Sequence, residues 1–282
     1  MTASLARGPA ICVHDAMALT GESPCWDAGR GILWWIDIQG QRLLAHAAEG
    51  QNRAIPLPLM PGFVALHDSG DLWLGLENGV WRYDPESGDL DLLAKTNANP
   101  RLRLNDGKFD RRGRLWFGTM DKSGPTGGPV GALWRLDPNG TLHKMRKNVS
   151  IPNAICFAPQ GDRIYFADTA LARIETATLG SDGAPGPWEV LCRFEAGEHP
   201  DGAVADAEGA IWVAVVGGNR IERILPDGHR AGVVPLPVSR PTMPCFGGAG
   251  GNVLFVTSQR RFLTADDLRA QPWAGALIAV AV

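Results

Sequence analysis

Short apolar runs, each containing an aromatic residue, recur along the whole chain and are separated by polar, glycine-rich segments. Each run is short and rich in β-branched and aromatic residues, which is typical of a buried strand. The runs follow one another at intervals of roughly 40 to 50 residues, which is the length of one β-propeller blade. The pattern predicts six related units, centred on Ile32–Ile36, Asp71–Leu74, Leu115–Phe117, Ile164–Phe166, Ile211–Val213 and Asn252–Val256.

Turn-forming residues divide each unit further and place its strands. Turns that contain Asp or Gly precede most aromatic runs and favour a tight hairpin between the first and second strands of a unit. A second apolar run followed by a Pro, Asp or Gly turn predicts the third strand and its hairpin to the fourth. The first set of turns comprises residues 67–70, 110–113, 158–161 and 206–209, and the third strands are Val80–Tyr83, Leu133–Leu136 and Ile221–Ile224.

The chain shows no long stretch of helical periodicity, and its 35 Gly and 21 Pro residues argue against long helices. The predicted fold class is therefore all-β, a six-bladed β-propeller. The repeat continues without a linker, so we expect a single domain over residues 1–282. Apolar runs at the two ends, Ala10–Val13 and Ala276–Val280, are expected to pair and close one blade, because an open propeller would expose strand edges.

Composition excludes several classes of partner. A formal charge of -3 with 20% charged residues provides no basic surface for nucleic acid and no polybasic membrane patch. The apolar stretch near the N-terminus contains His14 and Asp15, so we expect neither a signal peptide nor a membrane span. The five cysteines form no CxxC pair, which favours buried thiols and a cytoplasmic location. No obligate protein partner is inferred.

Four polar residues share one position in the repeat. Glu22, Asn105, Asn153 and Asp201 each precede the aromatic of their unit by about 11 or 12 residues, and equal phase in a repeat means an equivalent place in space. In a propeller these side chains would converge on the central axis. Convergent oxygen donors suggest a metal site or a site for a polar ligand.

Each of these residues also has a simpler interpretation. Glu22 alone could be an exposed turn acid, and Asn153 is a common turn residue. Asp106 and Gly107, next to Asn105, could form a hairpin turn without any ligand. Asp201 has a counterpart within the chain, since Asp227 lies in a similar Pro-Asp-Gly segment but follows a third strand, where a plain hairpin suffices. The shared phase is the reason to favour a site.

Arg103 and Asn105 alternate with leucines, so both polar side chains would point to one face of a short strand. Arginine there can grip a carboxylate or carbonyl oxygen, and asparagine can bind a hydroxyl. The other two units supply the largely apolar segments 60–63 and 242–246 at this phase, as expected for the walls of a small-molecule pocket.

Glu22, Asn153 and Asp201 offer only oxygen ligands, two of them charged, which suits a hard divalent cation. The donors favour Ca²⁺, Mg²⁺ or Mn²⁺. Zn²⁺ and Fe²⁺ stay open, although no histidine or cysteine ligand is available for them. The chain contains no HExxH motif and no GxSxG motif, so neither a zinc protease nor a serine hydrolase is indicated.

Seven motifs in order resemble the senescence marker protein 30, regucalcin and gluconolactonase family of six-bladed propellers, and the resemblance covers essentially the whole chain. They are residues 21–24, 103–108, 117–120, 151–153, 168–169, 200–202 and 241–248. The resemblance implies hydrolysis of sugar lactones with one divalent metal ion, Ca²⁺ first, held by Glu22, Asn153 and Asp201. It also implies that Arg103 and Asn105 orient the substrate and that Asp201 is the catalytic base.

Family members often carry an acidic substrate contact after the Gly-Thr-Met motif. Here Asp121 is the candidate, but the segment after it is unusually rich in glycine. The expected partner is a small sugar lactone, an aldonolactone such as glucono-, arabinono- or xylonolactone. Two alternatives remain at this stage, namely a phosphotriesterase or esterase with the same fold, and a propeller that binds calcium without catalysis.

Overall fold

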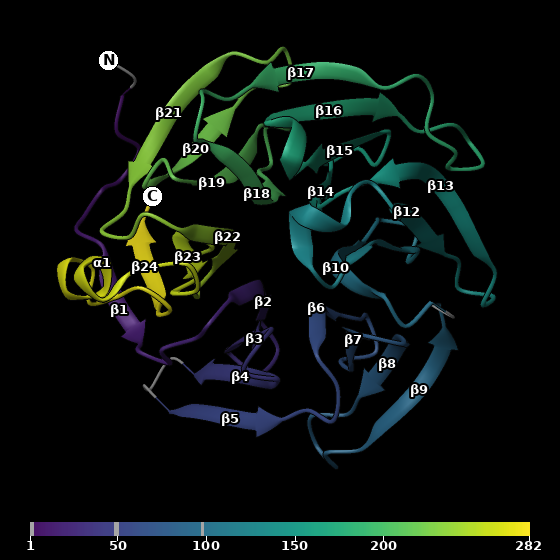
Figure 1. The fold of residues 1–282 in the computed structure, drawn as a ribbon, viewed down its shortest axis with the longest axis horizontal. Coiled ribbons are helices and arrows are strands. Elements are labelled where there is room, and N and C mark those ends of the chain that lie inside the picture. Colours follow the sequence, from purple (N-terminus) through teal and green to yellow (C-terminus); the bar gives the residue numbers. More distant parts are fainter. Residues whose placement is uncertain (1–2, 48–50, 97–98) are drawn as a thin grey trace.

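The computed structural model describes residues 3–47, 51–96 and 99–282. Six four-stranded antiparallel sheets are arranged as blades around a central axis, with the first strand of each blade innermost (Figure 1). This confirms the predicted all-β class and the six-bladed propeller. A membrane-spanning helix of sufficient length and apolarity is not found in the described part of the chain.

Blades 1 to 5 each use four consecutive strands. Blade 1 consists of β2 (Gly21–Asp27), β3 (Ile32–Asp37), β4 (Arg42–Ala47) and β5 (Asn52–Pro56); blade 2 of β6 (Pro61–Leu66), β7 (Leu72–Leu76), β8 (Gly79–Tyr83) and β9 (Leu90–Lys95); blade 3 of β10 (Leu102–Phe109), β11 (Leu115–Asp121), β12 (Gly131–Leu136) and β13 (Leu142–Val149). Blade 4 consists of β14 (Pro152–Phe157), β15 (Arg163–Asp168), β16 (Arg173–Thr178) and β17 (Glu189–Arg193); blade 5 of β18 (His199–Ala205), β19 (Ile211–Val216), β20 (Arg220–Ile224) and β21 (Arg230–Pro235).

Blade 6 is built from both ends of the chain, as β22 (Pro241–Gly247), β23 (Val253–Ser258), β24 (Leu277–Ala281) and β1 (Ile11–His14). β1 pairs antiparallel with β24 and forms the outer edge of this blade. The connection between β23 and β24 is long, covers residues 259–276, and contains the short helix α1 (Ala265–Ala270). Two turns of 3₁₀ helix, η1 (Gly124–Gly127) and η2 (Thr169–Leu171), lie in the corresponding connections of blades 3 and 4.

The aromatic runs form the second strand of each blade and pack between neighbouring blades. Trp34 and Ile36 of β3, for example, are fully buried and belong to one cluster with Leu72 and Leu74 of β7. A single blade cannot bury both of its faces, so the packed blades supply the core. Full burial of one such large side chain contributes roughly 1.5–3 kcal/mol.

The turn before the aromatic strand also anchors the aromatic residue. Asp110 accepts a hydrogen bond from Trp116 Nε1 at 2.9 Å and from the backbone N–H of Arg112 and Arg114. Asp206 accepts from Trp212 Nε1 at the same distance in blade 5. In blades 3 and 5 one aspartate therefore caps the hairpin and satisfies the indole N–H of the aromatic strand.

Candidate active site

Every inner strand contains a β-bulge close to the same level of the channel. The register shifts between Glu22 and Cys25 in β2, between Asn105 and Gly107 in β10, and at equivalent places in β6, β14, β18 and β22. Ser23, Asp106 and Ala154 take positive φ angles of 49°, 35° and 52° within these bulges. Such backbone is strained for residues other than glycine, and bulges next to active sites re-aim a side chain.

The bulges place the four predicted polar residues at one level. Glu22 lies opposite Ile36, Asn105 opposite Gly118 and Asn153 opposite Ala167, and each partner lies two positions after the aromatic residue of its strand. Asp201 lies within the bulge of β18. The same level is occupied in the other two blades by Gly62 and by Thr242, whose buried hydroxyl donates a hydrogen bond to the Gly21 carbonyl.

A chain of hydrogen bonds joins the site residues of blades 3, 4 and 5. Arg103 Nη1 donates to Asn105 Oδ1 at 2.8 Å, and Asn105 Nδ2 donates to Asn153 Oδ1 at 3.0 Å. Asn153 Nδ2 then donates to the Thr169 hydroxyl, which donates to the Pro200 carbonyl, both at 2.8 Å. The chain fixes the amide orientations and ends one residue before Asp201.

Glu22 and Asp201 form the acidic part of the site. Their carboxyl groups are hydrogen-bonded to each other, and burial raises the pKa of both. The pKa of Asp201 rises to about 7 because of burial and the nearby negative charge of Asp106, while Arg240 opposes the rise. Two adjacent buried carboxyls cannot both ionise without a neutralising partner, so they must share a proton or a cation.

The donor set at this level fits a hard divalent cation. Glu22 and Asp201 supply two carboxylates, and among the described residues Asn153 Oδ1 accepts one hydrogen bond, from Asn105, so its second lone pair can face a cation. Asp106 Oδ1 is buried and has no hydrogen-bond partner among the described residues, and its other oxygen accepts from the Ile155 N–H. Across the described ranges, no cluster of three or more histidine, cysteine and acidic side chains is grouped to hold a metal. The predicted set differs from such a cluster because one of its three oxygens comes from an amide.

Asp121 makes contacts that differ from those of the other predicted site residues. Its carboxylate accepts from the backbone N–H of Ser123 at 2.8 Å and from the Ser123 hydroxyl at 2.6 Å, and it forms an ion pair with Arg101. A Cβ atom at Gly127 would lie 2.2 Å from the Asp121 carboxyl carbon, so the glycine lets the loop close over the acid. Asp121 thus holds the loop after β11, and its role in substrate binding stays a prediction.

Three site features were not predicted from the sequence. The alternative of a hairpin at Asp106 and Gly107 is wrong, because β10 continues to Phe109 and Asp106 is buried in the bulge. Thr169 links Asn153 to blade 5. Arg240 lies near Asp201, and a signal for it was present, since Arg240 precedes Thr242 by the same interval that separates Arg103 from Asn105.

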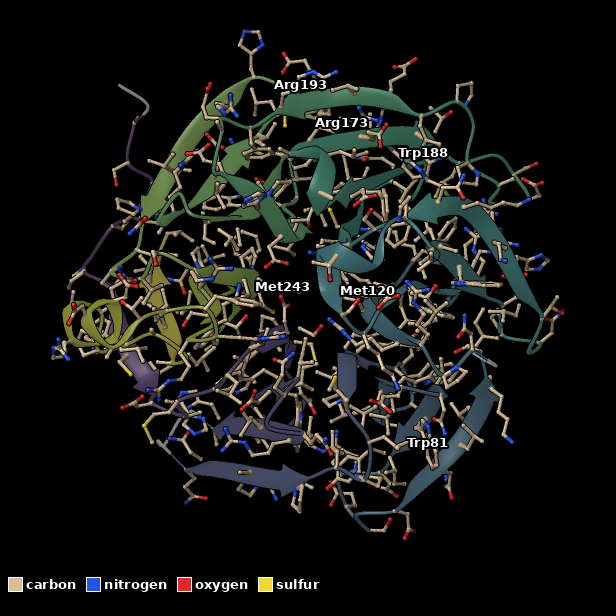
Figure 2. All side chains as sticks on the ribbon, in the orientation of Figure 1. Trp81, Met120, Arg173, Trp188, Arg193 and Met243 are labelled. Atoms are coloured by element: carbon tan, nitrogen blue, oxygen red, sulfur yellow. The ribbon has the colours of Figure 1, made fainter. Side chains whose placement is uncertain are left out.

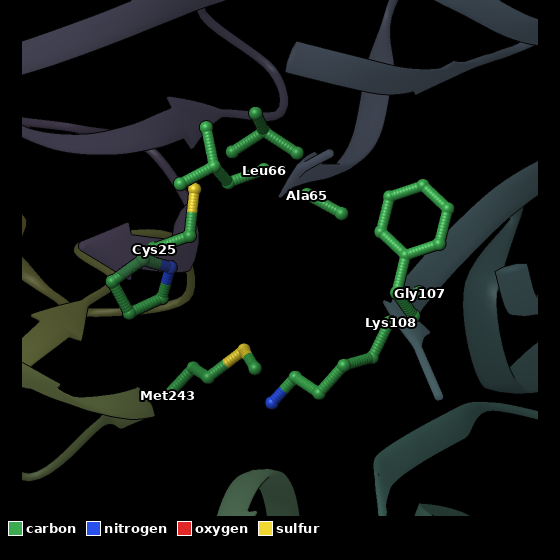
Figure 3. A pocket seen from close by; sticks show the side chains of 9 residues that line it. Cys25, Ala65, Leu66, Gly107, Lys108 and Met243 are labelled. Carbon is green, nitrogen blue, oxygen red and sulfur yellow. The ribbon is translucent and has the colours of Figure 1, made fainter. Parts of the chain in front are cut away.

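A mainly apolar cavity of about 200 Å³ lies further along the inner strands. Cys25, Lys108 and Met243 point into it (Figure 3), and Met243 lies close to the axis (Figure 2). Lys108 Nζ donates to the Ala203 carbonyl at 2.8 Å, and its charge partly counters the burial that raises the pKa of Asp106. The lysine therefore closes the acidic site on this side.

These features define a class of protein, namely a six-bladed propeller with a buried cluster of acids, amides and an arginine at its axis. The family model described as SMP-30/Gluconolactonase/LRE-like region matches residues 20–260. The chain belongs to this family.

Similar proteins agree with that assignment over nearly the full length of the chain. A 6-deoxy-6-sulfogluconolactonase of Pseudomonas putida is 31% identical over 275 residues, covering 96% of this chain and 94% of the relative. An L-arabinolactonase of Azospirillum brasilense is 31% identical over 272 residues, covering 95% and 90%. The crystal structure of regucalcin from Agrobacterium tumefaciens, described as a calcium-binding protein, superimposes with a TM-score of 0.91 at 30% identity, covering 96% and 92%.

Proposed function

We propose that this protein is a divalent-metal-dependent hydrolase that opens sugar lactones, such as glucono-, arabinono- or xylonolactone, to aldonic acids. The observation that carries the proposal is the pairing of a buried Glu22–Asp201 carboxyl pair with the hydrogen-bonded chain from Arg103 to Asn153. Relatives named for lactone hydrolysis, one for an arabinolactone and one for a sulfonated gluconolactone, support it.

Asp201 acts as the general base. A catalytic carboxylate works best when its pKa lies near the working pH, and burial raises the pKa of Asp201 to about 7. It takes a proton from the water that attacks the lactone carbonyl. The alcohol oxygen of the opened ring then receives a proton, and the product is a free aldonate.

Arg103 and Asn105 orient the lactone. Arg103 is buried, and both of its hydrogen bonds to protein oxygens in the described part of the chain use Nη1. Its other N–H groups can therefore donate to the oxygens of a lactone. Since Asn105 is held by Arg103 and Asn153, the donors are fixed before the substrate arrives, which favours a productive position of the carbonyl.

Glu22, Asn153 and Asp201 would hold one divalent cation, with Ca²⁺ first and Zn²⁺, Mn²⁺, Mg²⁺ and Fe²⁺ as alternatives. When bound, the cation supplies Lewis-acid polarisation of the ring carbonyl and neutralises the two carboxylates. Removal of either carboxylate would therefore weaken both ion binding and hydrolysis.

Steady-state kinetics on a panel of pentono- and hexonolactones test the proposal, with metal-stripped protein supplemented by one ion at a time. Asp201→Asn keeps the shape of the side chain but removes the base, so kcat should fall by at least about 10²-fold. Asp227→Asn is the matched control, because Asp227 lies in an exposed hairpin of nearly the same sequence. If Asp201→Asn retains more than about a tenth of the wild-type kcat, Asp201 is not the base. Turnover of phosphotriesters or simple esters but of no lactone would favour the esterase alternative.

A further inference from the structure

Two arginines occupy equivalent positions in blades on opposite sides of the central axis. Arg103 lies two residues before Asn105 in blade 3, and Arg240 lies two residues before Thr242 in blade 6. Blades 3 and 6 face each other across the axis (Figure 1). A lactone held by Arg103 would therefore direct its far end towards Arg240.

The long connection of blade 6 adds a second arginine beside Arg240. The Gln259 N–H donates to the Arg240 carbonyl at 3.0 Å, and the Arg261 N–H donates to the Leu19 carbonyl at 2.9 Å. Thr20 and Gln259 form a β-bridge. Because Thr20 lies two residues before Glu22, these bonds fix the connection at the end of the channel where the metal and substrate residues lie.

Phe262 contacts both arginines through its ring, and its own position is unusual. Its side chain is 69% exposed, and its φ of 70° is an unfavourable backbone conformation for a bulky residue. Arg240 Cζ lies 5.4 Å and Arg261 Cζ 4.6 Å from the centre of its ring. Strain of this kind persists where the surroundings enforce it, and it clusters at ligand sites.

Within the described residues, no close ion pair holds the guanidinium group of Arg240 or Arg261, although the nearby charge of Asp201 acts on Arg240. Most other arginines in the described ranges pair with a carboxylate. Arg240 Nε is buried without a hydrogen-bond partner. The charge of Arg261 also reaches across the mouth, where it adds to the burial that lowers the pKa of Arg103 to about 10.

We propose that Arg240 and Arg261, which both contact the ring of Phe262, bind an acidic substituent of the lactone at the end away from the ring carbonyl. The substituent is a carboxylate, phosphate or sulfonate, because guanidinium groups bind such oxyanions through paired, charge-assisted hydrogen bonds. The exposed ring of Phe262 provides an apolar surface for the sugar carbons beside it. This inference rests on the lactonase activity proposed above and adds that acidic sugar lactones are preferred to neutral ones.

The test compares kcat/KM for gluconolactone, which is neutral, with kcat/KM for glucarolactone and for the phosphate and sulfonate derivatives of gluconolactone, each corrected for spontaneous hydrolysis. The wild-type protein should prefer at least one acidic lactone, and the preferred one identifies the substituent. Arg261→Gln should lower the ratio of acidic to neutral kcat/KM by about 10- to 100-fold, which is the range for loss of a hydrogen bond to a charged group.

Arg260→Gln is the matched control, because it removes the same charge from the neighbouring position, where the side chain makes no ion pair and no ring contact with the described residues. It should leave the ratio at its wild-type value. The inference would be overturned if the wild-type protein and Arg261→Gln had the same ratio of acidic to neutral kcat/KM. If neutral lactones were still hydrolysed, the lactonase proposal would stand. Absence of turnover on every lactone would overturn both.

Discussion

The Glu22–Asp201 pair leads to a prediction in which loss of function increases stability. In the metal-free protein, ionisation of Asp201 places a negative charge in a buried site near Asp106, so Asp201→Asn should stabilise this form above neutral pH. The folded state holds a proton that the unfolded chain releases at its ordinary pKa of 3.8, because burial raises the pKa to about 7. The stability of metal-free wild-type protein must therefore fall as pH rises from about 4 to about 7.

The size of the stabilisation by Asp201→Asn follows from the shift in the pKa of Asp201. One pKa unit corresponds to about 1.4 kcal/mol, so the rise from 3.8 to about 7 costs the metal-free protein at most about 4 kcal/mol at pH 8. Asp201→Asn removes this cost, and its amide can still donate to Glu22. For a chain of this size 1 kcal/mol corresponds to about 2–4 °C in Tm, so we expect Tm to rise by roughly 5–15 °C at pH 8.

The assay is thermal unfolding followed by circular dichroism, on metal-free protein at pH 5 and pH 8, with and without added Ca²⁺. The advantage of Asp201→Asn should disappear at pH 5, where the wild-type carboxyl is protonated. Ca²⁺ should stabilise the wild-type protein more than the variant, because a ligand stabilises only the state that binds it. Asp227→Asn should change Tm little under all conditions. A metal-free Asp201→Asn protein that melts at or below the wild-type temperature at pH 8 would refute the argument that burial of the Asp201 charge destabilises the metal-free protein.

Three further predictions concern the metal, the substrate and blade closure. Chelation should abolish most lactone hydrolysis. The affinity for Ca²⁺ should rise from pH 6 to pH 8, because Glu22 and Asp201 must release their shared proton when the ion binds. Calorimetry in two buffers of different ionisation enthalpy measures the number of protons released. Arg103→Ala should mainly raise KM, with a smaller loss of kcat, in steady-state assays at saturating metal. Deletion of residues 1–16 removes β1 and exposes the edge of β24, so Tm should fall sharply in a melting experiment.

The fold was predictable because each blade repeats the same local signals. Trp116 with Asp110, and Trp212 with Asp206, illustrate the rule that a buried aromatic strand follows a turn that can cap it. The bulges were not predictable, because the residues that take positive φ include Ser23 and Ala154, which have no intrinsic preference for that conformation. They are imposed by the pairing with the second strand and by contacts between blades, which a local pattern does not contain.

The site was predictable only as far as it follows the repeat. The shared phase identified four residues that the structure places at one level, and the order of the blades explains why Asn105 meets Asn153. Arg261 and Phe262 lie in the long connection between β23 and β24, which differs in length and content from the corresponding connections of the other blades, so no periodicity could place them beside Arg240. Asp121 is the opposite case. The resemblance to the family suggested that it contacts the substrate, whereas its carboxylate bonds to Ser123 and to Arg101 in the structure.

Blade 6 takes its inner strands from the end of the chain and its outer strand from the beginning, and this order has a consequence during synthesis. Glu22 leaves the ribosome early, but Asp201, Arg240 and the strand that β1 pairs with follow only at the end. Contacts between such distant segments form slowly, because the chain must close a long loop before they contribute. The growing chain therefore cannot complete this site until β24 has been synthesised. The paired acids emerge into the cell separated and fully solvated, and they become a high-energy pair only when the last blade closes.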